Sequence, residues 1–297
     1  MTREIRPMHV KSLINQNSAH YDFDATINPY RGCSHACKYC YARDSHAYLE
    51  LDIGTEFETI LFSKIFSRAQ LRRELDRLPL SKVLAIGTAT DPYQPLESKA
   101  LNTRRILEAV RDTGHGISIT TKSPLILRDL DILKILAERG QLVVHISLIT
   151  MDRDLCRHLE PGTASPDRRW KAIDRLVALN IPVALLCAPL IPEWTDQWEN
   201  LDALFQAATI HQASWVMTGL SHFTPSMLAY FFKHLSTLDA SRAKAFQSHF
   251  NERAELHVEY RQTLNAQLRT LYARYQLQSS GPGPVPFHQF TQPQWTF

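Results

Sequence analysis

The chain has 297 residues, of which 44% are hydrophobic and 21% charged, a composition that disfavours a disordered or membrane-embedded protein. Its formal net charge of +3 is too weakly basic to identify nucleic acid as a partner. The longest apolar stretch, residues 183–191, is too short to span a bilayer, and the N-terminus has no apolar targeting segment, so we expect a cytoplasmic protein without a membrane partner.

The middle of the chain alternates short β-branched runs with longer helical patterns, which is typical of strand–helix units around a parallel sheet. Strands are expected at residues 24–30, 82–88, 116–121, 141–147, 181–189 and 215–218. Helices are expected between and after them, at about 101–110, 130–136, 170–179, 196–208 and 225–235. Six units are too few to close an eight-stranded barrel. Residues 59–63 could be an extra strand or an extended loop.

The two ends of the chain differ from this middle part. We expect an N-terminal extension over residues 1–22, a core over 23–240 and a C-terminal part over 241–297. In the last part, residues 251–276 have a polar helical pattern, and the Gly/Pro-rich run at 281–286 ends regular structure.

Three cysteines, Cys33, Cys37 and Cys40, follow the first expected strand in a C-x-x-x-C-x-x-C arrangement. Three such thiolates can hold three irons of one [4Fe–4S] cluster and leave the fourth iron without a protein ligand, whereas a ferredoxin uses a fourth Cys. Zinc normally takes four ligands, and His35 or His46 could in principle complete a zinc site. An odd count of five cysteines and the lack of a signal peptide disfavour a disulfide. We therefore expect an iron–sulfur cluster with one open iron.

The polar segments of the chain follow the expected strands. In parallel α/β barrels the active site lies at the carboxyl ends of the strands. After the first strand come the cysteines, and after the others come residues 88–97, 121–123, 147, 189–192 and 218–222. We expect these segments to surround a single pocket.

The cysteine spacing, with Tyr39 just before the last cysteine, resembles the radical S-adenosylmethionine superfamily. Residues 24–222 are similar to its photolyase-like group, which is related to spore photoproduct lyase. The T-x-T-D run at 88–91, the T-K pair at 121–122 and Ser147 carry this similarity. The resemblance implies an α/β fold, a partial (β/α)6 TIM-like barrel with a helical C-terminal extension.

The same resemblance implies the cofactors and their ligands. Cys33, Cys37 and Cys40 would hold a [4Fe–4S] cluster whose open iron binds S-adenosylmethionine, and a flavodoxin or ferredoxin type of protein would supply electrons. The cofactor would be bound by Tyr39, Thr90, Asp91, Lys122 and Ser147. A Lys ammonium suits the cofactor's carboxylate. Lys122 could instead be a surface residue that opens a helix, and Thr90 could be a turn or N-cap hydroxyl.

One position departs from the lyase pattern. In the lyase, a cysteine two residues before a cofactor-binding serine donates a hydrogen atom, but Thr88 stands here and its O–H bond is too strong for that step. Cys187 could replace it as donor, although a buried Cys is also a common core residue. His222 is our candidate for substrate contact, whereas we expect His145 to be a satisfied core histidine.

The function implied by the resemblance is a lyase or modification enzyme. It would reductively cleave S-adenosylmethionine to a 5′-deoxyadenosyl radical, which removes a hydrogen atom from a substrate; the similarity suggests nucleic acid as that substrate. The alternative is a non-catalytic iron–sulfur or zinc protein that senses redox state or binds nucleic acid. Such a protein would not need Lys122 and Ser147 together at the carboxyl ends of the strands.

Overall fold

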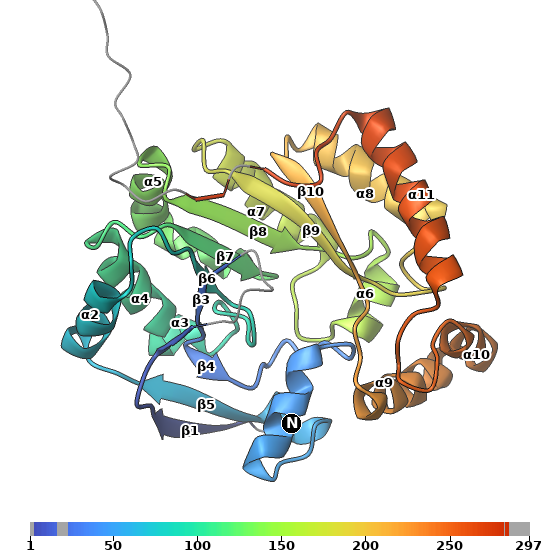
Figure 1. The fold of residues 1–297 in the computed structure, drawn as a ribbon, viewed down its shortest axis with the longest axis horizontal. Helices are drawn as coiled ribbons and strands as arrows, with labels where there is room; N and C mark the ends of the chain where they lie inside the picture. The colour runs from blue at the N-terminus through green and yellow to red at the C-terminus, as the bar shows by residue number, and fades with distance from the viewer. Residues whose placement is uncertain (1–2, 17–22, 282, 285–297) are drawn as a thin grey trace, which may run out of the picture.

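The structure is a computed structural model that describes residues 3–16, 23–281 and 283–284 (Figure 1). Its main sheet has the strand order β10-β9-β8-β7-β6-β3-β2, in which the first six are mutually parallel and β2 is antiparallel to β3. The strands are β2 (Ile14–Gln16), β3 (Ala25–Ile27), β6 (Leu84–Ile86), β7 (Ile117–Thr121), β8 (Leu142–Ser147), β9 (Val183–Leu190) and β10 (Trp215–Leu220). The six parallel strands are those expected from the sequence, and the open parallel sheet confirms the partial barrel.

Helices cover the outer face of this sheet (Figure 1). Alternate strand residues such as Val144 and Ile146 of β8 pack with the apolar sides of these helices in one large core. The helices between the strands are α2 (Arg68–Arg77), α3 (Glu97–Ala100), α4 (Asn102–Arg111), α5 (Leu130–Glu138), α6 (Arg153–Leu159), α7 (Pro166–Val177) and α8 (Trp198–Ile210). The inner face of the sheet is consequently free to form the inside of the barrel.

A second, three-stranded sheet lies beside the first, in the order β1-β5-β4. Its strands are β1 (Glu4–His9), β4 (Tyr30–Arg31) and β5 (Ile60–Ile65). Residues 59–63, which the sequence left open, therefore contribute to a strand. The expected N-terminal extension supplies β1 and β2, and each pairs with a strand of the core.

Around β4 and β5 lie short helical segments: η1 (Tyr41–Leu49), a 3-10 helix directly after the cysteines, and α1 (Thr55–Thr59). A further 3-10 helix, η2 (Pro124–Asp129), follows β7.

Three helices follow β10 in the described chain, the first of them at the helix expected near residues 225–235. α9 (Pro225–Leu238) and α10 (Ala240–Ser248) pack against each other, and α11 (Val258–Tyr275) packs on α8. The helix expected at 251–276 begins later, at Val258, because Phe250 and Leu256 form a short antiparallel bridge before it. Half of the Gly/Pro-rich run, residues 282, 285 and 286, lies outside the described residues. None of the helices in the described ranges is long and apolar enough to cross a membrane.

Candidate functional site

The three cysteines lie on the loop between β4 and η1. All are free thiols; Cys33 and Cys37 are buried and Cys40 is half-buried. Burial is the main cause that raises the pKa of Cys37, and Glu160, Cys40 and Cys33 raise it further against the opposing charge of Lys122. The three sulfurs are therefore close enough to interact electrostatically. Within the described ranges, no three His, Cys, Asp or Glu side chains form a site for a single metal ion.

The start of the cysteine loop is held by the segment after β6. The carbonyl of Gly32 accepts hydrogen bonds from Thr90 Oγ1 (2.7 Å) and Gln94 Nε2 (3.2 Å). Gln94 Oε1 in turn accepts a hydrogen bond from the backbone N–H of Ser34 at 2.9 Å. Gly32 has a φ of +76°, and a Cβ there would lie 2.9 Å from the Ile60 carbonyl oxygen, so the tight approach requires glycine. Thr90 thus positions the cysteine loop.

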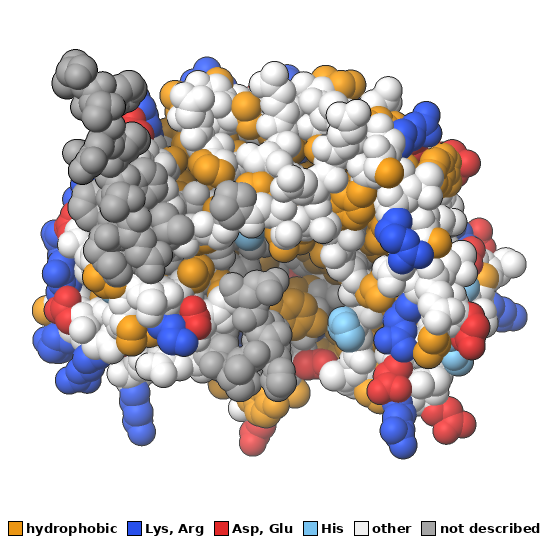
Figure 2. Space-filling view, turned by 45° about the horizontal axis from the view of Figure 1, so that its top comes forward, with side chains coloured by type: hydrophobic (Ala, Val, Ile, Leu, Met, Phe, Trp, Pro, Cys, Tyr) orange, Lys and Arg blue, Asp and Glu red, His pale blue; other side chains and the backbone are white. Residues whose placement is uncertain are grey.

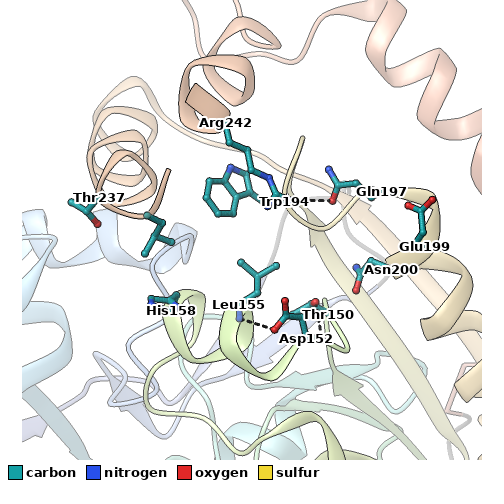
Figure 3. A pocket seen from close by; sticks show the side chains of 11 residues that line it. Thr150, Asp152, Leu155, His158, Trp194, Gln197, Glu199, Asn200, Thr237 and Arg242 are labelled. Atoms are coloured by element: carbon teal, nitrogen blue, oxygen red, sulfur yellow. Dashed lines mark hydrogen bonds between the residues drawn. The ribbon is translucent and has the colours of Figure 1, made fainter. Parts of the chain in front are cut away.

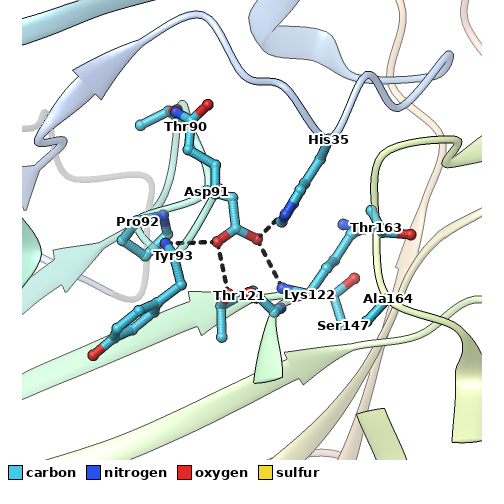
Figure 4. A network of polar contacts seen from close by, with 12 residues as sticks. His35, Thr90, Asp91, Pro92, Tyr93, Thr121, Lys122, Ser147, Thr163 and Ala164 are labelled. Atoms are coloured by element: carbon cyan, nitrogen blue, oxygen red, sulfur yellow. Dashed lines mark hydrogen bonds and ion pairs between the residues drawn. The ribbon is translucent and has the colours of Figure 1, made fainter. Parts of the chain in front are cut away.

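Asp91 joins the cysteine loop to the end of β7 (Figure 4). One carboxylate oxygen lies 3.1 Å from His35 Nδ1 and accepts a hydrogen bond from the Lys122 N–H at 2.8 Å. The other accepts from Thr121 Oγ1 (2.6 Å) and from the Tyr93 N–H (2.9 Å). Burial by itself would raise the pKa of Asp91, but His35 and the hydrogen bonds from Thr121 and Lys122 outweigh it and lower the pKa to about 2. Both carboxylate oxygens of Asp91 are therefore engaged by other residues of the protein.

A third segment, residues 159–163 after α6, holds the middle of the cysteine loop. The Lys38 N–H donates to the Leu159 carbonyl at 2.8 Å, and the Gly162 N–H donates to the His35 carbonyl at 2.9 Å. The two backbones approach so closely that a Cβ at Gly162 would overlap the Ser34 carbonyl oxygen and lie 2.8 Å from His35 Cα. Only glycine fits there without moving one of the two loops.

Beneath this contact is a buried ion pair between Glu160 and Arg169. Glu160 is 1% exposed and Arg169 0% exposed. Arg169 donates to Glu160 and also to the Ser147 carbonyl at 2.8 Å, and the Tyr39 hydroxyl donates to Glu160. Burial opposes ionisation of Glu160, but the charges of Arg169 and Lys122 outweigh it and lower the pKa of this carboxyl. The Glu160–Arg169 pair therefore joins Tyr39 of the cysteine loop, which donates to Glu160, to the end of β8, whose Ser147 carbonyl accepts from Arg169.

Lys122 and Ser147 are two further polar side chains of this site, and their interactions within the protein are incomplete. Lys122 Nζ lies 3.9 Å from Glu160 Oε1 and 5.8 Å from the centre of the Tyr39 ring. Because Glu160 is already bound by Arg169, two cations face one carboxylate. Ser147 Oγ is buried and has no hydrogen-bond partner among the described residues. An unpartnered buried hydroxyl is costly unless a ligand satisfies it, so the residues present fit a ligand that carries a carboxylate and further polar groups.

Two other predicted residues lie elsewhere. Cys187 is fully buried in the core between the sheet and the outer helices, on the side of Tyr272 of α11, so the structure does not bring it to the cysteines. His222 is exposed and directly follows β10. Two residues later, Thr224 Oγ1 donates to Asp44 of η1 at 2.7 Å. The segment of His222 therefore lies beside the helix that follows the cysteines.

A separate groove of about 560 Å³ lies between α6, the β9–α8 loop and α10 (Figure 3). Its polar side chains are largely engaged within the protein. Asp152 caps α6, Asn200 donates to the Ile149 and Thr195 carbonyls, and Arg242 lies over the Trp194 ring at 4.5 Å. None of the residues predicted from the sequence lines it.

Sequence reasoning did not identify Glu160 and Arg169. Charged residues are rarely fully buried unless they are paired, and a pair nine residues apart in a loop and a helix leaves no periodic pattern. The Glu-Pro-Gly run at 160–162 was the one available signal, because it places a carboxylate beside a tight backbone approach.

Proteins with similar sequences agree with this fold and this site. A family model described as the radical SAM superfamily matches residues 27–205. An uncharacterised protein of Mycobacterium tuberculosis is 34% identical over 270 residues, which cover 90% of this chain and 79% of that protein. An uncharacterised protein of Methanocaldococcus jannaschii is 29% identical over 174 residues, covering 57% and 61%.

Among solved structures, spore photoproduct lyase complexed with a dinucleoside spore photoproduct matches with a TM-score of 0.68 at 16% identity. The match covers 91% of this chain and 79% of the lyase. At this identity the likeness shows the fold, and the same partial barrel occurs in a variant of that lyase with bound S-adenosylmethionine, at a TM-score of 0.66.

Proposed function

The chain belongs to the radical S-adenosylmethionine superfamily, whose members use a [4Fe–4S] cluster and S-adenosylmethionine, and we propose that it removes a hydrogen atom from a substrate. When bound, the cluster and S-adenosylmethionine supply a 5′-deoxyadenosyl radical for this step. The protein's part is to bind, orient and shield these groups. The observation that carries the proposal is the coincidence of the three cysteines with an incompletely neutralised Lys122 and an unpartnered Ser147.

Cys33, Cys37 and Cys40 would hold the cluster, because thiolates are the ligands that iron–sulfur clusters select. The loop that carries them is fixed from three sides, by Gln94, by Asp91 and by the backbone of residues 159–162. A loop held in this way keeps the three sulfurs in place before the cluster is present. Such preorganisation reduces the ordering cost of binding.

Lys122 and Ser147 would hold the methionine end of S-adenosylmethionine. The Lys122 ammonium supplies a charge for the carboxylate, and Ser147 Oγ supplies a hydrogen bond. Glu160 keeps Lys122 and Tyr39 next to each other, since its carboxylate contacts both. We assign Thr90 and Asp91 to positioning the cysteine and Lys122 loops, because their polar atoms are already bonded within the protein.

An apolar cluster shields the site on one side. Tyr39 packs edge-on against Phe231 of α9, with ring centres 6.3 Å apart, and Phe231 packs against Phe246 of α10. Cys37 belongs to the same cluster. The C-terminal helices therefore exclude water from one side of the cysteine loop, which protects reactive groups from side reactions.

Nucleic acid is the first substrate class to test, on the strength of the fold shared with spore photoproduct lyase. The lyase's hydrogen-donor position is occupied here by Thr88, whose Oγ1 accepts a hydrogen bond from Asn28 Nδ2 at 3.0 Å. We therefore propose that this protein uses a different hydrogen donor, or none. We also propose a flavodoxin or ferredoxin type of electron donor, a contact between His222 and the substrate, and a cytoplasmic location.

The test is anaerobic reconstitution with iron and sulfide, followed by metal analysis and electron paramagnetic resonance of the reduced protein. The proposal predicts about four irons per chain and a spectrum that changes when S-adenosylmethionine is added. One zinc per chain, or a cluster whose spectrum ignores S-adenosylmethionine, would favour the non-catalytic alternative.

A further inference from the structure

The inner face of the main sheet is less completely buried than its outer face. On β7, Ile117 and Ile119 are buried against the helices, whereas Ser118 and Thr120 between them are only half-buried. The same alternation places half-buried His145 on β8 between Val144 and Ile146 of the outer core. Since successive strand residues point to opposite faces, the half-buried residues line the inside of the barrel. Figure 2 shows the molecule hollowed near its centre, with hydrophobic and histidine side chains at the margin of the hollow.

The strand register places the inner residues in two levels. His145 is paired with Thr120 on one side and Ala184 on the other, and Ala184 is paired with Trp215. Ser147 lies one level higher, paired with Leu186, which is paired with Met217. His145 and Ser147 are two residues apart on one strand, so their Cα atoms are separated by about 6.6 Å. A group held by His145 would therefore lie next to Ser147.

The lower end of this space is closed by the chain after α11. Gly281 lies against the ring of Trp215, and the Val216 N–H donates to the Gln278 carbonyl at 3.1 Å. Pro284 lies against Gly116, at the start of β7. The chain after α11 thus lies against the amino ends of β7 and β10, at the end of the sheet opposite the cysteine loop.

The described inner residues of β7 to β10 are mostly apolar, and none of them is a carboxylate, lysine or arginine. These residues are Ser118, Thr120, Val143, His145, Ser147, Ala184, Leu186, Ala188, Trp215 and Met217. Burial lowers the pKa of His145 to about 4, so its imidazole is neutral near pH 7. A neutral imidazole offers one donor and one acceptor, and His145 Nδ1 lies 3.5 Å from Thr120 Oγ1, at the limit of hydrogen bonding. Thr120 is thus the hydrogen-bond partner of His145 within the described ranges.

We propose that this cavity binds an uncharged, hydrogen-bonding part of the substrate, with His145 and Thr120 as its polar contacts. A carboxylate or phosphate would find no counter-charge on the described walls, and burying an unpaired charge is strongly unfavourable. A neutral ring or amide would instead satisfy the imidazole and the hydroxyl and fill the space beside Ala184. The inference rests on the proposed function, which assigns the methionine end of S-adenosylmethionine to Lys122 and to Ser147, one level above His145.

Thiol labelling of the reconstituted holoenzyme tests the cavity without knowledge of the substrate. Thr120→Cys and His145→Cys place a thiol inside the barrel, and Ile119→Cys and Ile146→Cys are matched controls on the opposite face of the same strands. Each is treated with methyl methanethiosulfonate, which is neutral, and with its anionic sulfonatoethyl and cationic trimethylammonium-ethyl analogues. Peptide mass mapping follows the engineered thiol, and the rates are divided by those at Ser248→Cys, an exposed position on α10.

We expect the neutral reagent to modify Thr120→Cys and His145→Cys at least about tenfold faster than either charged reagent, and the Ile119→Cys and Ile146→Cys controls to stay unmodified. If the inner thiols are as unreactive as the controls, the barrel is filled and the inference is wrong. Equal relative rates for charged and neutral reagents would also overturn it. Neither result bears on radical chemistry, because formation of 5′-deoxyadenosine tests the proposed function separately.

Discussion

Lys122 Nζ lies 3.9 Å from Glu160 Oε1, but Glu160 is already engaged by Arg169, so the lysine charge is only partly compensated. The pKa of Lys122 reflects this environment. Burial would lower it, yet the electrostatic interactions with Cys37 and Glu160 outweigh burial and raise it above its ordinary value, so the side chain stays charged. A charged lysine held beside the cysteine loop is available for an anionic ligand.

Replacing Lys122→Met should weaken S-adenosylmethionine binding without removing the cluster. A hydrogen bond to a charged group contributes about 1.5–3 kcal/mol, which corresponds to roughly a 10- to 150-fold higher Kd. Equilibrium binding to the reconstituted protein measures this, with Lys134→Met as the control, because Lys134 is an exposed helix residue. An unchanged Kd in Lys122→Met would remove this residue from the cofactor site.

Breaking the Glu160–Arg169 pair from one side should destabilise the protein strongly. Removing one partner of a buried pair costs about 3–5 kcal/mol, because the other charge is left uncompensated. We expect Glu160→Gln to lower the free energy of unfolding in urea by this amount, because it leaves the buried Arg169 without its carboxylate, and Arg169→Met to lower it less, because Lys122 still faces Glu160. The double variant Glu160→Gln, Arg169→Met should lose less than the sum of the two single variants. Additive losses would show that the two side chains do not act as a pair.

Gly162→Ala should reduce the amount of cluster that the protein holds. The new methyl group would overlap the Ser34 carbonyl and force the cysteine loop away from residues 159–163. Gly283→Ala is the matched control, since a Cβ at Gly283 meets nothing within 4 Å. Iron and sulfide per chain after identical reconstitution are the readout, and equal loading of the two variants would contradict the role of this contact.

The low pKa of Asp91 predicts an acid-dependent loss of stability. Its pKa is about 2 in the folded protein and close to 3.9 in an unfolded chain. The carboxylate therefore contributes about 2 kcal/mol above pH 5, and this contribution is lost as the pH falls toward 2. About half should be gone by pH 3.

Urea unfolding of the cluster-free protein at pH 6, 4 and 3 measures this loss. Asp91→Asn should be less stable than the wild type at pH 6 and should lack the wild-type decrease attributed to Asp91. A variant whose free energy of unfolding falls in parallel with the wild type would show that Asp91 does not titrate as proposed.

The sequence predicted the barrel well because its strands are short apolar runs with clear helical patterns between them. It left residues 59–63 undecided and did not indicate β1, because β1 carries charged residues and a proline and is defined by pairing with β5. Those contacts join segments more than fifty residues apart, and local periodicity does not encode them.

For the site, the cysteine spacing and the positions after the strands led to Cys33, Cys37, Cys40, Lys122 and Ser147, whose ligand roles are predictions. The sequence could not show that the side chains of Thr90 and Asp91 are hydrogen-bonded within the protein, which is the basis of the positioning role proposed for them. Cys187 was ambiguous for a related reason. A residue in a buried strand can face the barrel or the helices, and only its packing with the outer core shows which.

The most direct test of the account is the formation of 5′-deoxyadenosine by the reconstituted protein with dithionite and S-adenosylmethionine under anaerobic conditions. We predict that the wild type forms it, that Cys37→Ala does not, and that Cys156→Ala, a change at a cysteine outside the C-x-x-x-C-x-x-C loop, still does. A fully loaded cluster that forms no 5′-deoxyadenosine, or a Cys37→Ala variant that remains active, would contradict the central claim.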